Sequence, residues 1–254
     1  MDKEQYEILY RVEESHWWYL GMRKIVDSLL NQYLDPARAV RILDAGCGTG
    51  GTMQHLRRFG PVFGVDMAED ALDRCCCRDF SCLARGSVEQ LPFIDSSFDL
   101  LVSFDVIYHR AVRDDALALK EFHRVLSPGG LIVLRVPAYN WLRGAHDVAV
   151  HTGRRYSRGE LGRKLRDAGF QLRKLTYVNT LLFPLAAMKR LVEGTRHFLR
   201  PDLDLPHPLL NRALLGVLNL ESYLLPAVSF PWGLSVVAVA EKAVSDQPSA
   251  AGDP

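Results

Sequence analysis

The stretch Val40-Arg-Ile-Leu-Asp-Ala-Gly-Cys-Gly-Thr-Gly-Gly51 decides the fold of this chain of 254 residues. Its first four residues form a short, mainly apolar run, which is typical of a buried strand. Gly46, Gly48 and Gly50 then allow a tight turn and a close approach of the backbone to a ligand, because no Cβ atom stands in the way. The next residues open a helix whose free N–H groups point back at the turn. A strand, a glycine turn and a helix N-terminus in this order predict a crevice for a nucleotide.

Two acids flank the turn and bear on which nucleotide the crevice takes. Asp66 lies 20 residues after Gly46, at the end of a second expected strand, where it would meet a ribose diol. With the G-x-G-x-x-G spacing of the glycines, this pattern also fits a nicotinamide dinucleotide. Asp44 favours another ligand, because a carboxylate two residues before the first glycine would repel a pyrophosphate. The same carboxylate suits the ammonium and sulfonium groups of S-adenosylmethionine (SAM).

Several segments resemble the class I SAM-dependent methyltransferases. Leu43–Gly50 closely resembles their motif I, and Leu126-Ser-Pro-Gly-Gly130 also resembles their pattern. Glu14-Ser-His-Trp-Trp-Tyr19 is similar to a segment found in a bacterial subgroup of the family. The resemblance covers Val40–Phe170 and implies an α/β fold: a Rossmann-like, seven-stranded, mostly parallel sheet with helices on both faces, and SAM as the cofactor.

The resemblance also implies which residues hold the cofactor. In the family, the segment matching Gly86–Phe93 carries an Asp that meets the adenine amino group, and Ser87 stands at that position here. A hydroxyl carries no charge, so we expect adenine binding to rest on backbone groups of Ser87 and Val88. The expected cofactor residues are Asp44, Ala45, Gly46, Gly48, Gly50, Asp66, Met67, Ser87, Val88 and Phe104.

The three consecutive aromatics of the segment 14–23 exceed what one helix face can bury. One reading is a core staple that packs the N-terminal helices on the domain. The other is an aromatic cover over the cofactor, with Trp18 above it and Arg23 gripping the carboxylate of its methionine part. These readings are compatible.

The candidates for a general base lie on two later segments. His109 follows the expected fourth strand, where it either acts as a base or caps the next helix. His146 lies beside Asp147 in the long polar and aromatic segment Pro137–Tyr156, which we expect to set acceptor specificity. An amine, carboxylate or thiolate acceptor needs little help from a base, whereas a hydroxyl or carbon acceptor needs one. The sequence leaves open whether the acceptor atom is oxygen, nitrogen or carbon.

The composition and net charge indicate which binding partners and which cellular compartment to expect. A net charge of +1 gives no field that would gather a polyanion, so nucleic acid is not expected as a partner. The five cysteines have no zinc spacing and no disulfide framework, which predicts reduced thiols in a cytoplasmic protein and no bound metal. The first ten residues are acidic and polar rather than a signal peptide, and no apolar run is long enough to span a membrane.

The chain divides into five expected parts. An N-terminal helical cap (1–35) precedes the SAM-binding core (36–180), a helical insertion (181–230), the final strand (231–243) and a disordered tail (244–254). The insertion lies inside the hairpin of the last two strands. It either roofs a hydrophobic acceptor pocket, forms a homodimer face or rests on a membrane surface. Lys189, Arg190, Arg196 and Arg200 lie near its apolar face and keep the membrane option open.

Three hypotheses follow for the function. The first is a SAM-dependent methyltransferase acting on a small molecule. The second is a nicotinamide-dependent oxidoreductase, and the third is a non-catalytic protein of the same fold whose insertion is an interaction surface. No Asn/Asp-Pro-Pro-Tyr signature follows the fourth strand, which disfavours methylation of a nucleic-acid base amine.

Overall fold

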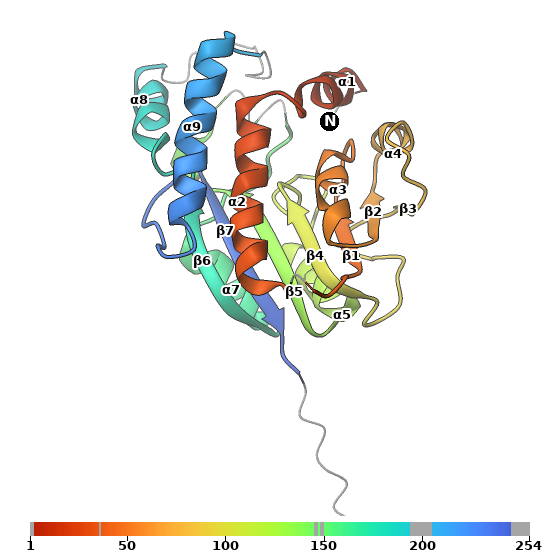
Figure 1. Cartoon of the computed structure of the whole chain (residues 1–254). Helices are drawn as coiled ribbons and strands as arrows, with labels where there is room; N and C mark the ends of the chain where they lie inside the picture. Colours follow the sequence, from red (N-terminus) through yellow and green to blue (C-terminus); the bar gives the residue numbers. More distant parts are fainter. Residues whose placement is uncertain (1–2, 36, 145–146, 148–149, 194–204, 245–254) are drawn as a thin grey trace, which may run out of the picture.

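A computed structural model describes residues 3–35, 37–144, 147, 150–193 and 205–244 (Figure 1). The helices are α1 (Lys3–Val12), α2 (Trp17–Tyr33), α3 (Gly51–Leu56), α4 (Glu69–Cys76), α5 (Asp115–Val125), α7 (Arg158–Asp167), α8 (Phe183–Glu193) and α9 (Pro208–Leu224). The strands are β1 (Ile42–Ala45), β2 (Val62–Asp66), β3 (Leu83–Arg85), β4 (Phe98–Phe104), β5 (Leu126–Pro137), β6 (Phe170–Val178) and β7 (Ser235–Lys242).

The seven strands form one sheet in the order β3-β2-β1-β4-β5-β7-β6. The first five strands of that order are parallel, and β7 runs antiparallel to both of its neighbours. The strand order reverses between β1 and β4, where the connections that leave the carboxyl ends of these two neighbouring strands run in opposite directions. Ligands bind at such a point in open α/β sheets. The predicted sheet and its antiparallel last strands are confirmed.

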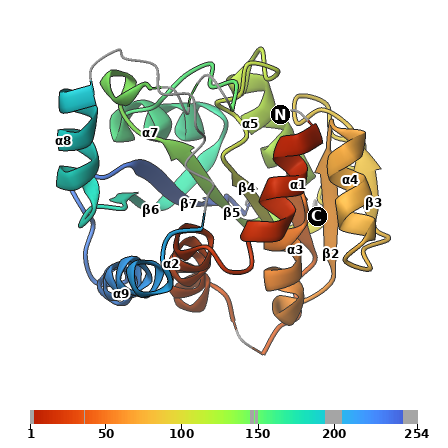
Figure 2. The ribbon, with the colours of Figure 1, turned by 90° about the horizontal axis from the view of Figure 1, so that it is seen from above.

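Helices cover both faces of the sheet (Figure 2). On one face, apolar side chains of α2, α3, α4 and α9 pack in a single core with β1, β4, β5 and β7. On the other face, α5 and α7 pack over the same strands. Both faces of the central strands are therefore buried, which explains why Ile42–Leu43 and Leu100–Val102 read as unbroken apolar runs.

The element boundaries differ from the sequence expectation at a few points. β1 begins at Ile42 rather than Val40. The apolar run Leu131–Val136 predicts the fifth strand, but β5 begins earlier, at Leu126, directly after α5, because Leu126 pairs with Phe98 across an irregular register. The first insertion helix, expected over 181–199, is α8 over Phe183–Glu193. Residues 194–204 and the expected disordered tail from 245 lie outside the described residues, as do the side chains of Lys189 and Arg190.

Candidate functional site

The glycine turn follows β1 and leads into α3. Gly46 has φ +88°, and a Cβ atom there would lie 2.2 Å from the side chain of Val106, so the position requires glycine for packing. Gly48 has φ +52°, and a Cβ atom there would meet nothing within 4 Å. Gly48 therefore borders open space, which a side chain would fill. We call the region formed by residues 44–50 and Asp66 the glycine crevice.

Asp44 is a buried acid with an unused oxygen. It is the third of the four residues of β1, it is 2% exposed, and its Oδ2 atom has no hydrogen-bond partner among the described residues. Burial, followed by the charges of Asp66 and Glu13, raises its pKa to about 8, although Arg135 opposes the shift. A buried carboxyl without a partner is costly, and a cation placed beside it would remove that cost. Asp44 is thus suited to a positively charged ligand.

Asp66 stands at the end of β2 and holds the glycine turn. Its Oδ2 atom accepts from the Gly48 N–H at 2.9 Å, and its Oδ1 atom accepts from the Ala68 N–H at 2.9 Å. Burial raises its pKa, and these two backbone hydrogen bonds act against the shift. A carboxylate has about four acceptor sites, so Asp66 retains capacity for the hydroxyl groups of a ribose.

The other predicted cofactor positions surround this crevice with unequal exposure. The Ala45 carbonyl accepts from the hydroxyl of Ser103 at 2.8 Å, and the Ser87 hydroxyl accepts from the backbone N–H two residues later at 3.1 Å. Val88 is buried, whereas Met67 is half exposed. Ser87 therefore uses its side chain to shape its own loop, and the role of the backbone of Ser87 and Val88 in adenine binding stays a prediction.

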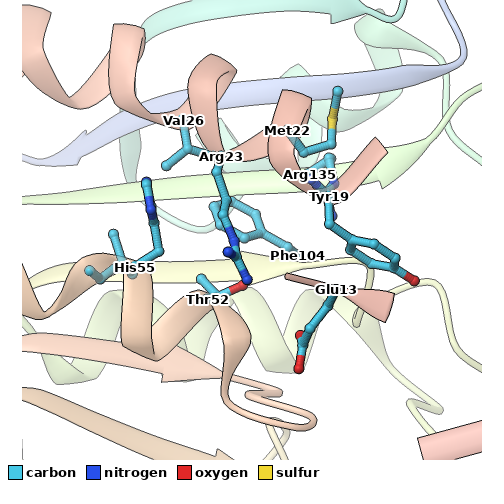
Figure 3. A pocket seen from close by; sticks show the side chains of 10 residues that line it. Glu13, Tyr19, Met22, Arg23, Val26, Thr52, His55, Phe104 and Arg135 are labelled. Carbon is cyan, nitrogen blue, oxygen red and sulfur yellow. The ribbon is translucent and has the colours of Figure 1, made fainter. Parts of the chain in front are cut away.

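A small cavity of about 40 Å³ lies between α2 and α3 (Figure 3). Helix α2 contributes four residues to its wall, Arg23 among them, and Glu13 contributes from the turn before this helix. A cavity of this size holds a few water molecules rather than a whole nucleotide. Its lining residues are Glu13, Tyr19, Met22, Arg23, Val26, Thr52, His55, Leu56, Phe104 and Arg135.

Arg23 reaches this cavity, but its guanidinium is already engaged. Its Nη1 and Nη2 atoms donate to the two carboxylate oxygens of Glu14 at 2.8 and 2.9 Å. The expected grip on a ligand carboxylate therefore requires Arg23 to exchange or share its partner. A second acid of the same segment, Glu13, accepts from the Thr49 hydroxyl at 2.6 Å and from Arg78 at 2.7 Å. Glu13 was not predicted as a site residue, and it ties the N-terminal segment directly to the glycine turn.

Arg135 is a second residue that the sequence reasoning missed. It is 8% exposed, and its guanidinium lies 4.7 Å from the Trp18 ring centroid and 5.1 Å from that of Phe104. Its Nε atom donates to Asp105 at 2.9 Å, and Asp105 itself follows β4 with φ +60°. The signal was present in the sequence, since Arg135 interrupts an otherwise apolar strand. Trp18 thus packs on a charged residue at the edge of the cavity, and its role as a cover over the cofactor stays a prediction.

His109 lies away from these contacts and holds a local turn. Its Nδ1 atom accepts from the Ala111 N–H at 3.1 Å, and its ring centroid lies 5.8 Å from that of His151. Burial lowers its pKa, and nearby positive charge adds to the effect. The next helix is capped by Asp114 instead. The alternative that His109 caps α5 is therefore wrong, because Asp114 supplies the acceptor.

Asp147 is buried and fully engaged by its own loop. Arg155 donates to its two oxygens at 2.8 and 3.0 Å, and the Gly144 N–H donates at 2.8 Å. Burial acts to raise its pKa, but the hydrogen bonds and charge of Arg155 outweigh burial and leave the pKa below its ordinary value. Asp147 braces the loop in this structure. Its sequence neighbour His146 lies outside the described residues.

In the described part of the chain, no group of three or more His, Cys, Asp or Glu side chains is placed to hold a metal ion. None of the helices resolved there has the length and hydropathy needed to cross a bilayer.

Comparison with known families gives a match over the crevice. The model of the methyltransferase domain family matches residues 43–134, from the middle of β1 to β5. This segment contains the glycine turn, Asp44, Asp66 and the loop of Ser87.

Curated relatives match the same half of the chain. The malonyl-[acyl-carrier protein] O-methyltransferase of Erwinia billingiae is 34% identical over 125 residues, which is 48% of this chain and 49% of that protein. The demethylmenaquinone methyltransferase of Staphylococcus aureus is 36% identical over 105 residues, 38% of this chain and 42% of that protein. The chain spans about half the length of the curated relatives it matches.

Solved structures share the fold over nearly the whole chain. A chain from the complex between the Haloferax volcanii Trm112 methyltransferase activator and a methyltransferase gives a TM-score of 0.62 at 18% identity. The match covers 97% of this chain and 96% of that one. At this identity the likeness shows the fold alone.

Proposed function

We propose that this protein, a member of the class I SAM-dependent methyltransferase family, transfers a methyl group from SAM to a small-molecule acceptor. One observation carries the proposal beyond the family match: Asp44 presents an unpartnered, buried carboxyl oxygen beside a glycine turn that opens onto free space. SAM carries two positive charges near its methyl group, on the sulfonium and the ammonium. The crevice offers two carboxyl groups, Asp44 and Asp66, which can carry the opposite charge.

The residues present fit the cofactor. Asp44 would hold the ammonium group, and Asp66 would accept hydrogen bonds from the ribose while it continues to hold Gly48. The backbone around Ser87 and Val88 would receive the adenine. The methionine end would enter the cavity that Arg23 and the N-terminus of α3 line (Figure 3).

The chain contributes alignment and water exclusion to the reaction. When bound, SAM supplies a methyl group on a cationic sulfur, which leaves as a neutral thioether. Trp18, Tyr19 and Phe104 form an aromatic wall above the carboxyl ends of β4 and β5, which excludes water from the transfer. His109, His146 and Asp147 remain our candidates for a base. Because Asp147 is held by Arg155, it would take part in base catalysis only through its sequence neighbour, His146.

The acceptor class rests on the relatives. One is named for a malonyl thioester carrier and the other for a quinone precursor, so their acceptors differ chemically. Both names support a small-molecule acceptor and neither supports a nucleotide acceptor. The nicotinamide-dependent alternative gains no support from the family match.

We further propose that the protein is cytoplasmic and that its acceptor is apolar. We also propose that the surface of α8 and α9 contacts a second copy of the chain or a membrane. Leu185 and Met188 of α8 are more than half exposed, as are Leu209, Leu220 and Tyr223 of α9. Gel filtration and liposome flotation of the whole chain, compared with a Leu220→Ser/Tyr223→Ser variant, test this contact. Monomeric, unbound wild-type protein would refute it.

The central experiment measures binding of SAM, S-adenosylhomocysteine and NADH to the same preparation by calorimetry. We expect micromolar binding of both adenosyl ligands and none of NADH. Radioactive methyl transfer from SAM to a panel of carboxylate, quinol and amine acceptors then identifies the class. Absence of SAM binding at high micromolar concentration would overturn the proposal and leave the non-catalytic alternative.

A further inference from the structure

The insertion helix α9 packs along α2 on one face of the sheet (Figures 1 and 2). The two helices touch closely at Gly21, where a Cβ atom would lie 2.2 Å from the side chain of Leu218. Leu218 and Leu225 are fully buried in the core that α2 helps to form. The second insertion helix is therefore attached to the N-terminal cap.

One end of α9 grips the turn between α1 and α2. The Asn211 side chain accepts from the Trp17 N–H at 2.9 Å through Oδ1 and donates to the Ser15 carbonyl at 3.0 Å through Nδ2. Trp17 is the first residue of α2, so its N–H has no partner inside the helix. Asn211 thus caps α2 from a position almost 200 residues away in the sequence.

The other end of α9 is fixed to the sheet. Glu221 is fully buried, and its Oε2 atom accepts from the Thr180 and Leu181 N–H groups at 2.8 and 3.3 Å. These residues directly follow β6, where the insertion leaves the sheet. The helix therefore runs as a strut from the end of β6 to the α1–α2 turn.

The turn that Asn211 holds carries one group that touches the glycine turn and one that packs on the wall of the cavity between α2 and α3. Glu13 binds Thr49 and Arg78 on one side of Ser15, and Trp18 lies over Arg135 on the other. A displacement of Ser15 or Trp17 would move both contacts, because only a few bonds separate them. The strut therefore sets the position of the crevice wall.

We propose that Asn211 is a positioning residue for SAM binding, acting through the turn of residues 13–18, and that this is a role of the insertion. The proposal rests on the proposed function for its ligand. Asn211 belongs neither to the glycine crevice nor to the residues that line the cavity between α2 and α3, so we expect its effect on SAM to pass through Ser15 and Trp17.

The test compares three variants of the full chain. Asn211→Ala removes both hydrogen bonds, and Asn211→Asp keeps the acceptor for Trp17 but loses the donor to Ser15. Asn219→Ala is the matched control, because Asn219 is exposed on the same helix. Each is measured for its SAM dissociation constant, its thermal midpoint and the hydrogen exchange of the peptide covering residues 13–20.

We expect Asn211→Ala to weaken SAM binding about fivefold and to speed exchange of that peptide about fivefold, as the loss of one or two net hydrogen bonds predicts. Asn211→Asp should fall between it and wild type, and Asn219→Ala should match wild type. An unchanged SAM dissociation constant in folded Asn211→Ala would overturn the proposal, even if its thermal midpoint fell.

Failure of the proposed function is visible separately, as wild-type protein that binds no SAM. Exchange of residues 13–20 then decides the inference by itself. Faster exchange confined to that peptide in Asn211→Ala supports the positioning of the turn, and unchanged exchange refutes it.

Discussion

Two of the buried carboxyl groups, one in the glycine crevice and one in the loop after β5, have opposite surroundings. In the glycine crevice, Asp44 has an oxygen without a partner among the described residues, and burial raises its pKa to about 8. In the loop after β5, Asp147 is paired with Arg155, and that pairing lowers its pKa in spite of burial. The loop acid has found its counter-charge inside the chain and stabilises the fold. The crevice acid forms no ion pair within the described residues, which suits it to binding a cation from outside.

The largest effect should come from Gly48→Val, which attacks the crevice alone. A branched side chain at φ +52° is strained and fills the space that the turn leaves open, so we expect loss of SAM binding by more than about 100-fold. Calorimetry measures it. Gly159→Val is the control, since a Cβ atom there also meets nothing within 4 Å but lies on α7. Normal SAM binding by Gly48→Val would mean that the crevice is misplaced.

Asp147→Ala should break the other region and leave the crevice intact. The substitution leaves the buried Arg155 guanidinium without its carboxylate partner, so the free energy of unfolding should fall by roughly 3 kcal/mol. Guanidinium denaturation followed by tryptophan fluorescence measures this loss. SAM binding by the folded variant should remain normal. A stability loss below about 1 kcal/mol would show that the pair is no stronger than a surface ion pair.

Asp44→Asn should give the reverse result. The neutral amide removes the negative charge, and SAM binding should weaken at least about tenfold. The free energy of unfolding should change by less than about 1 kcal/mol, because no hydrogen bond to the unpartnered oxygen is lost. Calorimetry and denaturation of the same sample measure both. A variant that loses stability but keeps SAM affinity would place Asp44 with Asp147 among the structural acids.

The smallest expected effect is a dependence of stability and of SAM affinity on pH, which arises from Asp44 and sharpens its contrast with Asp147. The pKa of Asp44 rises from 3.8 to about 8 in the folded protein, so the folded state retains a proton that the unfolded chain releases. In the window between pH 3.8 and about 8, the free energy of unfolding of the SAM-free protein is therefore greatest at the acid end and falls as the pH rises toward 8. SAM favours the charged carboxylate, so its dissociation constant should fall about eightfold from pH 7 to 8.5. Titrations in this range test it, and the dependence should vanish in Asp44→Asn.

The arrangement of the sheet followed from the sequence to a large extent. Short apolar runs ending at Asp44, Asp66 and Phe104 marked β1, β2 and β4, because strands buried on both faces leave no room for polar residues. Boundaries were less accurate. The early start of β5 depends on pairing with Phe98 across an irregular register, which no local pattern records.

The part of the site that is formed by residues close together in the sequence was predictable. The glycine turn and its two acids lie within 23 residues, Asp44 to Asp66, and their spacing alone indicated a crevice. Glu13 and Arg135 were missed as site residues, because each matters through a partner distant in sequence: Thr49 for the first, Trp18 for the second. The engagement of Arg23 by Glu14 and of Asp147 by Arg155 was equally invisible.

The sequence by itself determined the strand, the glycine turn and the identity of the acids, because these depend on backbone freedom and on residues close together in the chain. Only the tertiary structure decided which charges are paired and which remain available. It also decided that α9 holds the turn before α2, through Asn211 and the close contact of Leu218 with Gly21. Such contacts arise when distant segments are packed together, and their energy depends on burial that no single segment possesses alone.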